Sequence, residues 1–188
     1  MIEKYYPDLY FDSIRHIDIN ILKERGIKGV ILDIDNTLVP MHTLDADENA
    51  ISWVAELQKI GFKVCILSNA SLKRVTRFNK EMSVMAIHRA YKPAGKAFLA
   101  AAEKMGLEPE SVAVIGDQIF TDIYGGNKVN MLTVLVKPID KKEILYVRLK
   151  RHIEKRVLGR FSNVQKSGLE VRNEWKKNRL QIERSRLK

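Results

Sequence analysis

Residues 29–38 read GVILDIDNTL, which is four mostly apolar residues followed by two carboxylates, an amide, a hydroxyl and a leucine. A run that is apolar at every position predicts a strand buried on both faces of a sheet. Similar apolar runs recur at 62–67, 83–88, 111–116 and 131–136. Helical patterns separate these runs, and this alternation predicts an α/β fold with a Rossmann-like, doubly wound parallel sheet.

The helical patterns between the strands have recognisable ends. They lie at NAISWVAELQKI (49–60), at 71–81, at KAFLAAAEKMG (96–106) and near 120–129. Asp45 or Asp47 is expected to cap the first of them, and Gly61 to end it. Pro93 is expected to begin the third helix, because proline suits the first turn.

The composition excludes several classes of protein. The chain has 188 residues, of which 45% are hydrophobic and 30% charged, as in soluble globular proteins. No apolar run approaches the ~18 residues of a membrane span, and the N-terminus lacks the apolar stretch of a secretory signal. The single cysteine, Cys65, rules out an internal disulfide and a multi-cysteine zinc site. We therefore expect a cytoplasmic protein.

The positive charge is concentrated at one end of the chain. Residues 1–140 carry 17 Lys or Arg and 18 Asp or Glu, whereas residues 141–188 carry 16 and 5. We expect three parts: a helical lead-in at 1–25, the α/β domain at 26–160, and a basic tail at 161–188. A hypothesis about anionic partners must therefore concern the C-terminal quarter.

Polar residues follow four of the predicted strands. They are Asp33, Asp35 and Thr37 after the first, Ser68 and Asn69 after the second, Lys92 after the third, and Asp117 and Asp122 after the fourth. In an open parallel sheet, ligands bind beyond the carboxyl ends of the strands. Carboxylates suit Mg²⁺, and a metal ion and a lysine together neutralise phosphoryl oxygens. The ordered set therefore predicts a Mg²⁺-dependent phosphoryl-transfer site.

This pattern resembles the four motifs of haloacid-dehalogenase-like (HAD) phosphatases. The stretches that carry the likeness are ILDIDNTLV (31–39), KVCILSN (63–69), YKPAGKAF (91–98) and VIGDQIFTDIYGGN (114–127). Within these phosphatases the chain resembles the YqeG branch of subclass IIIA more closely, and that branch is similar to mitochondrial phosphatidylglycerophosphate phosphatase. Ala70 departs from the pattern, which has a second asparagine after Ser-Asn.

The resemblance implies a role for each motif residue. Asp33 is the expected nucleophile and Asp35 the general acid and base, while Lys92 neutralises charge. Phosphate binding is expected from Thr37, Ser68, Asn69 and Lys92. Mg²⁺ is expected at Asp33, Asp35 (through its backbone carbonyl), Asp117 and Asp122.

Three functions remain open on the sequence alone. The first is hydrolysis of a phosphomonoester, with phosphatidylglycerophosphate as the substrate that the resemblance implies. Residues 38–61 and 93–110 leave no room for a lid domain, and a capless site suits a large substrate or a headgroup at a surface. The second is a soluble sugar-phosphate or nucleotide phosphatase. The third is a non-enzymatic module, either receiver-like or associated with RNA or the ribosome. Asp35 argues against the receiver-like module, because a receiver does not need this residue.

The basic C-terminal region suggests a partner. In residues 141–160, Ile144, Leu145, Leu149, Ile153 and Val157 recur at helical spacing among Lys and Arg. A basic helical extension of this kind either packs its apolar stripe on the sheet or contacts anionic lipid at the inner face of the membrane. Nucleic acid is not the expected partner, because the sequence shows no stacking-aromatic platform.

Overall fold

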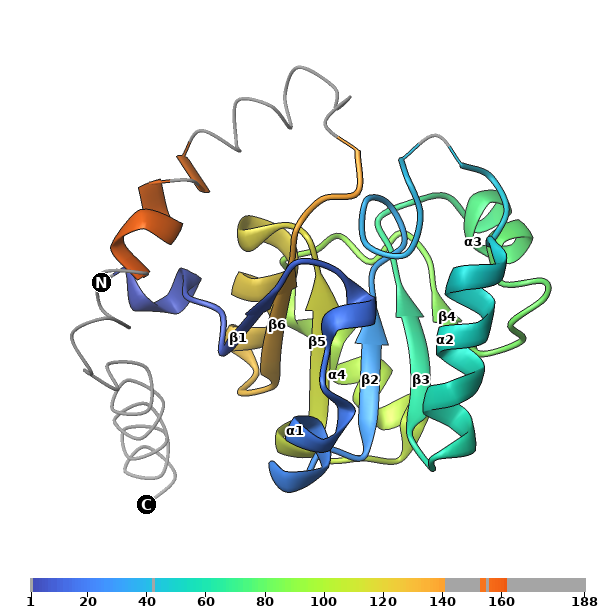
Figure 1. Ribbon diagram of the computed structural model, residues 1–188, viewed down its shortest axis with the longest axis horizontal. Helices are drawn as coiled ribbons and strands as arrows, with labels where there is room; N and C mark the ends of the chain where they lie inside the picture. The colour runs from blue at the N-terminus through green and yellow to red at the C-terminus, as the bar shows by residue number, and fades with distance from the viewer. Residues whose placement is uncertain (1, 42, 141–152, 155, 162–188) are drawn as a thin grey trace.

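The computed structural model describes residues 2–41, 43–140, 153–154 and 156–161. Its centre is a six-stranded sheet in the order β1-β6-β5-β2-β3-β4, in which every neighbouring pair is parallel (Figure 1). The strands are β1 (Leu9–Phe11), β2 (Gly29–Leu32), β3 (Lys63–Leu67), β4 (Met85–Ile87), β5 (Val112–Gly116) and β6 (Leu132–Val136). All six carboxyl ends therefore point to one rim of the sheet.

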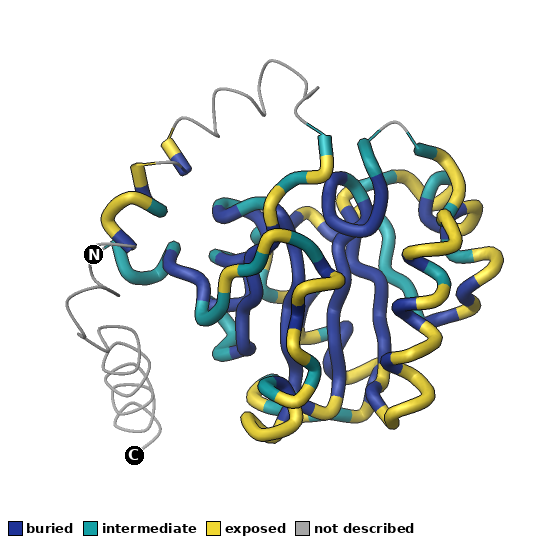
Figure 2. Tube along the Cα trace, in the orientation of Figure 1, coloured by how far each residue is buried: buried dark blue, intermediate teal, exposed yellow. Residues whose placement is uncertain are grey.

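The central strands are apolar throughout because successive side chains enter two different cores. Val30 and Leu32 of β2 pack beneath α2 (Glu48–Lys59) and α3 (Leu72–Phe78). Ile31 of the same strand packs on the other face, with α4 (Gly95–Met105). Helices on both faces of a parallel sheet confirm the doubly wound α/β fold. The buried strands appear as the dark centre of Figure 2.

Local sequence explains where the helices begin and end. Asp47 caps α2, accepting a hydrogen bond of 2.7 Å from the Ala50 amide. Ser71 caps α3 in the same way, and Gly106 ends α4 in a left-handed conformation at φ +61°. Pro93 differs from the prediction: it follows a cis peptide bond after Lys92 and lies outside α4, which begins at Gly95.

The prediction of a helical lead-in at residues 1–25 is only partly right, because this segment is not helical throughout. It contains α1 (Ile19–Glu24) and two 3₁₀ turns, but Leu9–Phe11 forms strand β1 and extends the sheet beside β6. Asp8 fixes this edge, because its carboxylate accepts a hydrogen bond of 2.7 Å from the Thr133 amide. The pairing joins segments more than 120 residues apart, so a local sequence pattern does not reveal it.

No lid domain covers the rim in the described residues. Between β2 and β3 they form only a loop and α2, and between β4 and β5 only α4 and the 3₁₀ turn Pro109–Ser111. After β5 the chain passes through a π-helical turn, Ile119–Ile123, into α5 (Tyr124–Lys128). The described part of the chain therefore has no cap domain. Within the described part of the chain, none of the helices combines the length and apolar character that a membrane crossing requires.

The described part of the C-terminal extension is helical and packs on the domain. Val157 and Phe161 are buried with Tyr6 and Leu135. Ile153, which we had placed in the apolar stripe, is instead 55% exposed. The remaining stripe residues, Ile144, Leu145 and Leu149, and the tail at 162–188 lie outside the described residues.

Candidate active site

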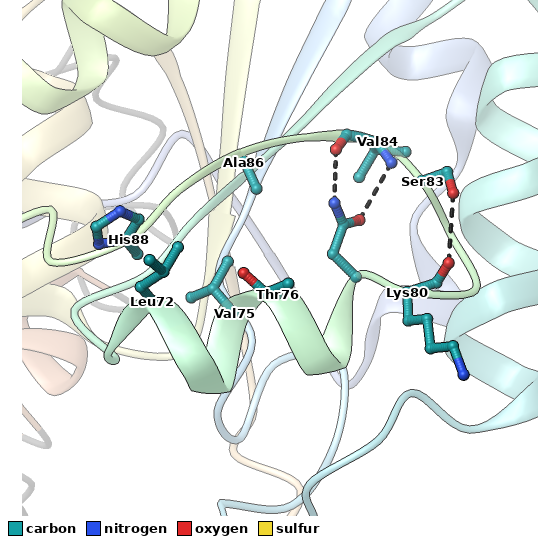
Figure 3. A pocket seen from close by; sticks show the side chains of 9 residues that line it. Leu72, Val75, Thr76, Lys80, Ser83, Val84, Ala86 and His88 are labelled. Atoms are coloured by element: carbon teal, nitrogen blue, oxygen red, sulfur yellow. Dashed lines mark hydrogen bonds between the residues drawn. The ribbon is translucent and has the colours of Figure 1, made fainter.

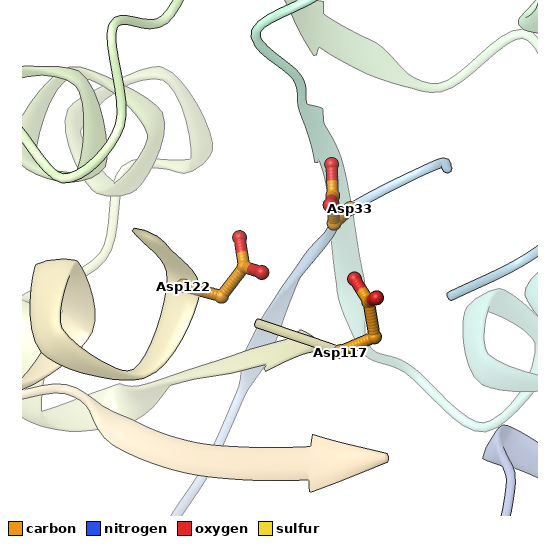
Figure 4. Close-up of side chains that lie close together, drawn as sticks. All are labelled: Asp33, Asp117 and Asp122. Carbon is orange, nitrogen blue, oxygen red and sulfur yellow. The ribbon is translucent and has the colours of Figure 1, made fainter. Parts of the chain in front are cut away.

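Three carboxylates converge at the carboxyl rim (Figure 4). Asp33 follows β2, Asp117 follows β5, and Asp122 lies in the turn before α5. One carboxylate oxygen from each lies within 4.8 Å of the others, and all three side chains are buried. The strand order explains this convergence, because β2 and β5 are hydrogen-bonded neighbours and the Asp33 amide continues their ladder to the Ile115 carbonyl.

Lys92 joins two of these carboxylates. Its ammonium nitrogen lies 2.7 Å from Asp33 Oδ1 and 2.6 Å from Asp122 Oδ1, and its side chain is 3% exposed. The charged groups of this cluster are three carboxylates and one ammonium. Because buried charge must be compensated, the excess of anions calls for a further cation. The oxygen donors suit a hard divalent ion, so the residues fit a metal site.

The electrostatics of Asp33 reflect this excess of negative charge. Burial raises the pKa of Asp33 to about 7, opposed by the charge of Lys92 and assisted by that of Asp122. Burial alone lowers the pKa of Lys92, but Asp122 and Asp33 outweigh it and hold that pKa above its ordinary value. Lys92 is therefore charged at neutral pH, whereas Asp33 needs more positive charge nearby to ionise fully.

Hydrogen bonds from two residues hold Asp117 and Asp122 in place, and a glycine leaves the space that Asp122 needs. The Thr37 hydroxyl donates to Asp117 Oδ1 at 3.3 Å, so Thr37 braces a carboxylate from another strand. Gly116 leaves room for Asp122, because a Cβ at Gly116 would lie 2.4 Å from the Asp122 Cγ. The Gln118 amide also donates to Asp122 Oδ2 at 3.2 Å.

Ser68 and Asn69 differ in what they contact. The Ser68 oxygen accepts a hydrogen bond from the Ala70 amide at 3.1 Å, and the side chain is buried at the end of β3. Asn69 is a predicted phosphate ligand. Its carboxamide oxygen accepts a hydrogen bond from the Lys92 amide at 2.7 Å, and its nitrogen donates to the Lys92 carbonyl at 3.4 Å. The Asn69 side chain therefore positions the backbone of Lys92.

Asp35 is the one predicted acidic residue that lies outside the carboxylate cluster. Its carboxylate pairs with Arg74 of α3 at 2.9 Å. Arg74 also donates to the Leu44 carbonyl at 2.7 Å and lies over the Phe78 ring. No local sequence pattern marks Arg74 as a site residue, because it lies among the charged residues of a short polar helix.

Fold and site together define a HAD-type phosphatase, that is, a phosphomonoester hydrolase. Residues 2–140 match the family model described as mitochondrial PGP phosphatase, and the chain belongs to that family. It is 40% identical over 159 residues to the probable phosphatase YqeG of Bacillus subtilis, covering 84% of this chain and 92% of that one.

Two further comparisons concern a longer relative and the fold. The chain is 30% identical over 167 residues to a phosphatidylglycerophosphate phosphatase of Arabidopsis thaliana, covering 82% of this chain and 47% of the longer plant protein. Among solved structures, a HAD-superfamily hydrolase from Ehrlichia chaffeensis is similar in fold, with a TM-score of 0.50 and 16% identity over 69% of this chain and 97% of that one.

Proposed function

We propose that the protein hydrolyses the phosphomonoester of phosphatidylglycerophosphate through an aspartyl-phosphate on Asp33, with Mg²⁺ as the cofactor. The observation that carries this proposal is the buried cluster in which Lys92 contacts Asp33 and Asp122, while Asp117 completes an oxygen-rich site. Bound Mg²⁺ would be held by Asp33, Asp117 and Asp122, and by the backbone carbonyl of Asp35, and it would neutralise charge on the phosphoryl oxygens.

In the first step, a carboxylate oxygen of Asp33 attacks phosphorus. The bond between phosphorus and the alcohol oxygen breaks as the new Asp33–phosphorus bond forms. The leaving oxygen takes a proton from Asp35, whose carboxyl group must turn away from Arg74 to deliver it. The alcohol then leaves.

In the second step, water attacks the phosphorus of the aspartyl-phosphate. Asp35, now ionised, accepts a proton from that water, and the bond from phosphorus to Asp33 breaks. Inorganic phosphate leaves, Asp33 returns as a carboxylate and Asp35 returns protonated. Asp35 is ionised between the two steps, and Arg74 stabilises that charge when the two side chains pair, as they do here at 2.9 Å.

The phosphoryl oxygens are held by groups around Asp33. Lys92 supplies a charged donor, and the Ser68 hydroxyl supplies a neutral one from the end of β3. Thr37 contributes indirectly, by fixing Asp117. Asn69 supports the site by holding the backbone of Lys92, and phosphate binding by its carboxamide stays a prediction.

The substrate assignment rests on relatives and on the open rim. The family description and the Arabidopsis relative both name phosphatidylglycerophosphate phosphatase. A capless site at the carboxyl rim accepts a large or surface-bound substrate. Such a substrate would place the protein in the cytoplasm, in peripheral contact with the inner face of the membrane. A relative that covers 47% of this chain is a glyceraldehyde 3-phosphate phosphatase, which keeps a small soluble phosphomonoester as the rival substrate.

A direct comparison of substrates tests the proposal. We would measure kcat/KM on phosphatidylglycerophosphate in mixed micelles, on glyceraldehyde 3-phosphate and on p-nitrophenyl phosphate, with Mg²⁺ and with EDTA. The proposal expects Mg²⁺-dependent turnover that favours the lipid and disappears in Asp33→Asn. A higher kcat/KM for glyceraldehyde 3-phosphate would overturn the lipid assignment, and activity that persists in EDTA would overturn the metal assignment.

A further inference from the structure

Two exposed apolar side chains lie beside the active site, one on the loop after β4 and one at the start of α3. Tyr91 is 76% exposed and directly precedes Lys92, and Leu72 is 55% exposed at the start of α3. They are the two most exposed of the large apolar side chains at this rim of the described structure. Exposed residues of this type at a binding rim need a reason, because water contact is unfavourable for them.

Hydrogen bonds join the loop after β3, residues 68–71, to the loop after β4, residues 88–94. The Arg89 amide donates to the Ala70 carbonyl at 2.9 Å, and the Ala90 amide donates to the Ser68 carbonyl at 3.0 Å. The Lys92 amide donates to the Asn69 side chain. Leu72 and Tyr91 are therefore carried on one rigid pair of loops beside the phosphate-binding Ser68, and not on independent segments.

The backbone of the loop after β4 is held in an unfavourable conformation. Arg89 has φ +45° and Tyr91 has φ +51°, in the left-handed region that favours glycine. Bulky residues there are costly and persist where the surrounding structure and a function require them. In this loop the conformation leaves the side chains of Arg89 and Tyr91 exposed.

Exposed cations lie beside these apolar residues. Residues 68–102 carry seven Lys or Arg and one Glu, and carboxylates outside this segment pair with three of those cations, Arg74, Arg77 and Lys92. Lys73, Arg89 and Lys96 are exposed. Next to Leu72 a groove of about 420 Å³ opens between α3 and β4, with His88 at the same end as Leu72 and Lys80 towards the other (Figure 3).

We propose that this docking face, formed by Leu72, Lys73, Arg89, Tyr91 and Lys96, binds an anionic lipid bilayer. Leu72 and Tyr91 would enter the interface between headgroups and acyl chains, and the cations would contact lipid phosphates. The carboxyl rim would then face the membrane, so that a phosphomonoester headgroup reaches Asp33 without extraction of the lipid. The inference deepens the proposed function and rests on it.

Vesicle sedimentation tests the docking face with the full chain. The probes are vesicles of phosphatidylglycerol with phosphatidylcholine, and vesicles of phosphatidylcholine alone. The double variant Leu72→Gln/Tyr91→Asn removes both apolar side chains, and asparagine tolerates positive φ. Ile60→Gln is the matched control, because Ile60 is 37% exposed at the opposite end of the sheet.

We expect the wild type and Ile60→Gln to bind the anionic vesicles equally, and the double variant to bind at least about tenfold more weakly. Equal binding by the double variant, or no binding by the wild type, would overturn the inference. The inference would also be overturned if neither form binds vesicles and the wild type is a dimer that the double variant does not form, because the face would then bind a second copy of the chain.

Hydrolysis of soluble p-nitrophenyl phosphate separates this inference from the proposed function. The double variant should retain the wild-type rate on it while losing turnover of vesicle-bound lipid. If Tyr91→Asn slows the soluble reaction through its neighbour Lys92, then Leu72→Gln alone must still weaken vesicle binding. A wild type that binds vesicles through this face but hydrolyses no phosphomonoester would overturn the proposed function and leave the docking face intact.

Discussion

The raised pKa of Asp33 predicts an unusual dependence of stability on pH in the metal-free protein. The folded-state pKa is about 7 against an ordinary value of 3.8. Between these values the folded protein binds a proton that the unfolded chain has released, so the free energy of unfolding falls as pH rises. At about 1.4 kcal/mol per pH unit, the loss between pH 5 and pH 7 is at most ~3 kcal/mol.

Other shifted groups titrate outside this pH window. Lys137 lowers the pKa of Asp12, and Arg77 lowers the pKa of Asp45. These two carboxyl groups therefore change the stability only at acid pH, below the ordinary carboxyl pKa. The raised pKa of Lys92 leaves it charged across the window. Asp33 is therefore the group expected to set the slope between pH 5 and pH 7.

Urea denaturation in EDTA measures this slope, with the fluorescence of buried Trp53 as a reporter. Saturating Mg²⁺ should remove the decline, because a bound cation favours ionised Asp33, and Asp33→Asn should remove it without metal. Stability in EDTA that rises from pH 5 to pH 7, or an equal decline in Asp33→Asn, would refute the reasoning.

Three further predictions concern single residues. In Gly116→Ala the new Cβ displaces the Asp122 carboxylate, so kcat on p-nitrophenyl phosphate should fall about a hundredfold; an unchanged kcat would show that Asp122 tolerates the displacement. Arg74→Ala releases Asp35 and should lower kcat about tenfold with little change in KM, with partial recovery in Arg74→Lys; a change in KM alone would assign Arg74 to substrate binding instead. Burial raises the pKa of Cys65 to about 12, so a thiol reagent should modify it only after unfolding in urea, and rapid modification in buffer would contradict its buried position.

The central sheet could be predicted because its strands carry a strong local signal. In β2, Val30 and Ile31 face different cores, so both must be apolar, and the same logic applies to β3 and β5. Strand β1 escaped prediction because it has three residues at a sheet edge and depends on its pairing with β6.

The position of the candidate site could also be predicted, whereas its internal contacts could not. Parallel strands must bring Asp33 and Asp117 to one rim, because β2 and β5 are neighbours. The partners of individual side chains depend on packing in three dimensions. Asn69 follows Ser68 in the chain yet contacts Lys92, and Asp35 reaches across to Arg74 on α3.

Trapping the covalent intermediate identifies the carboxylate that attacks phosphorus. The enzyme would be quenched in acid during steady-state turnover with Mg²⁺, treated with borohydride, which reduces an aspartyl-phosphate to homoserine, and analysed by peptide mass spectrometry. The account predicts homoserine at position 33 in the wild type and none in Asp33→Asn. Homoserine at position 35, or undiminished turnover in Asp33→Asn, would contradict it.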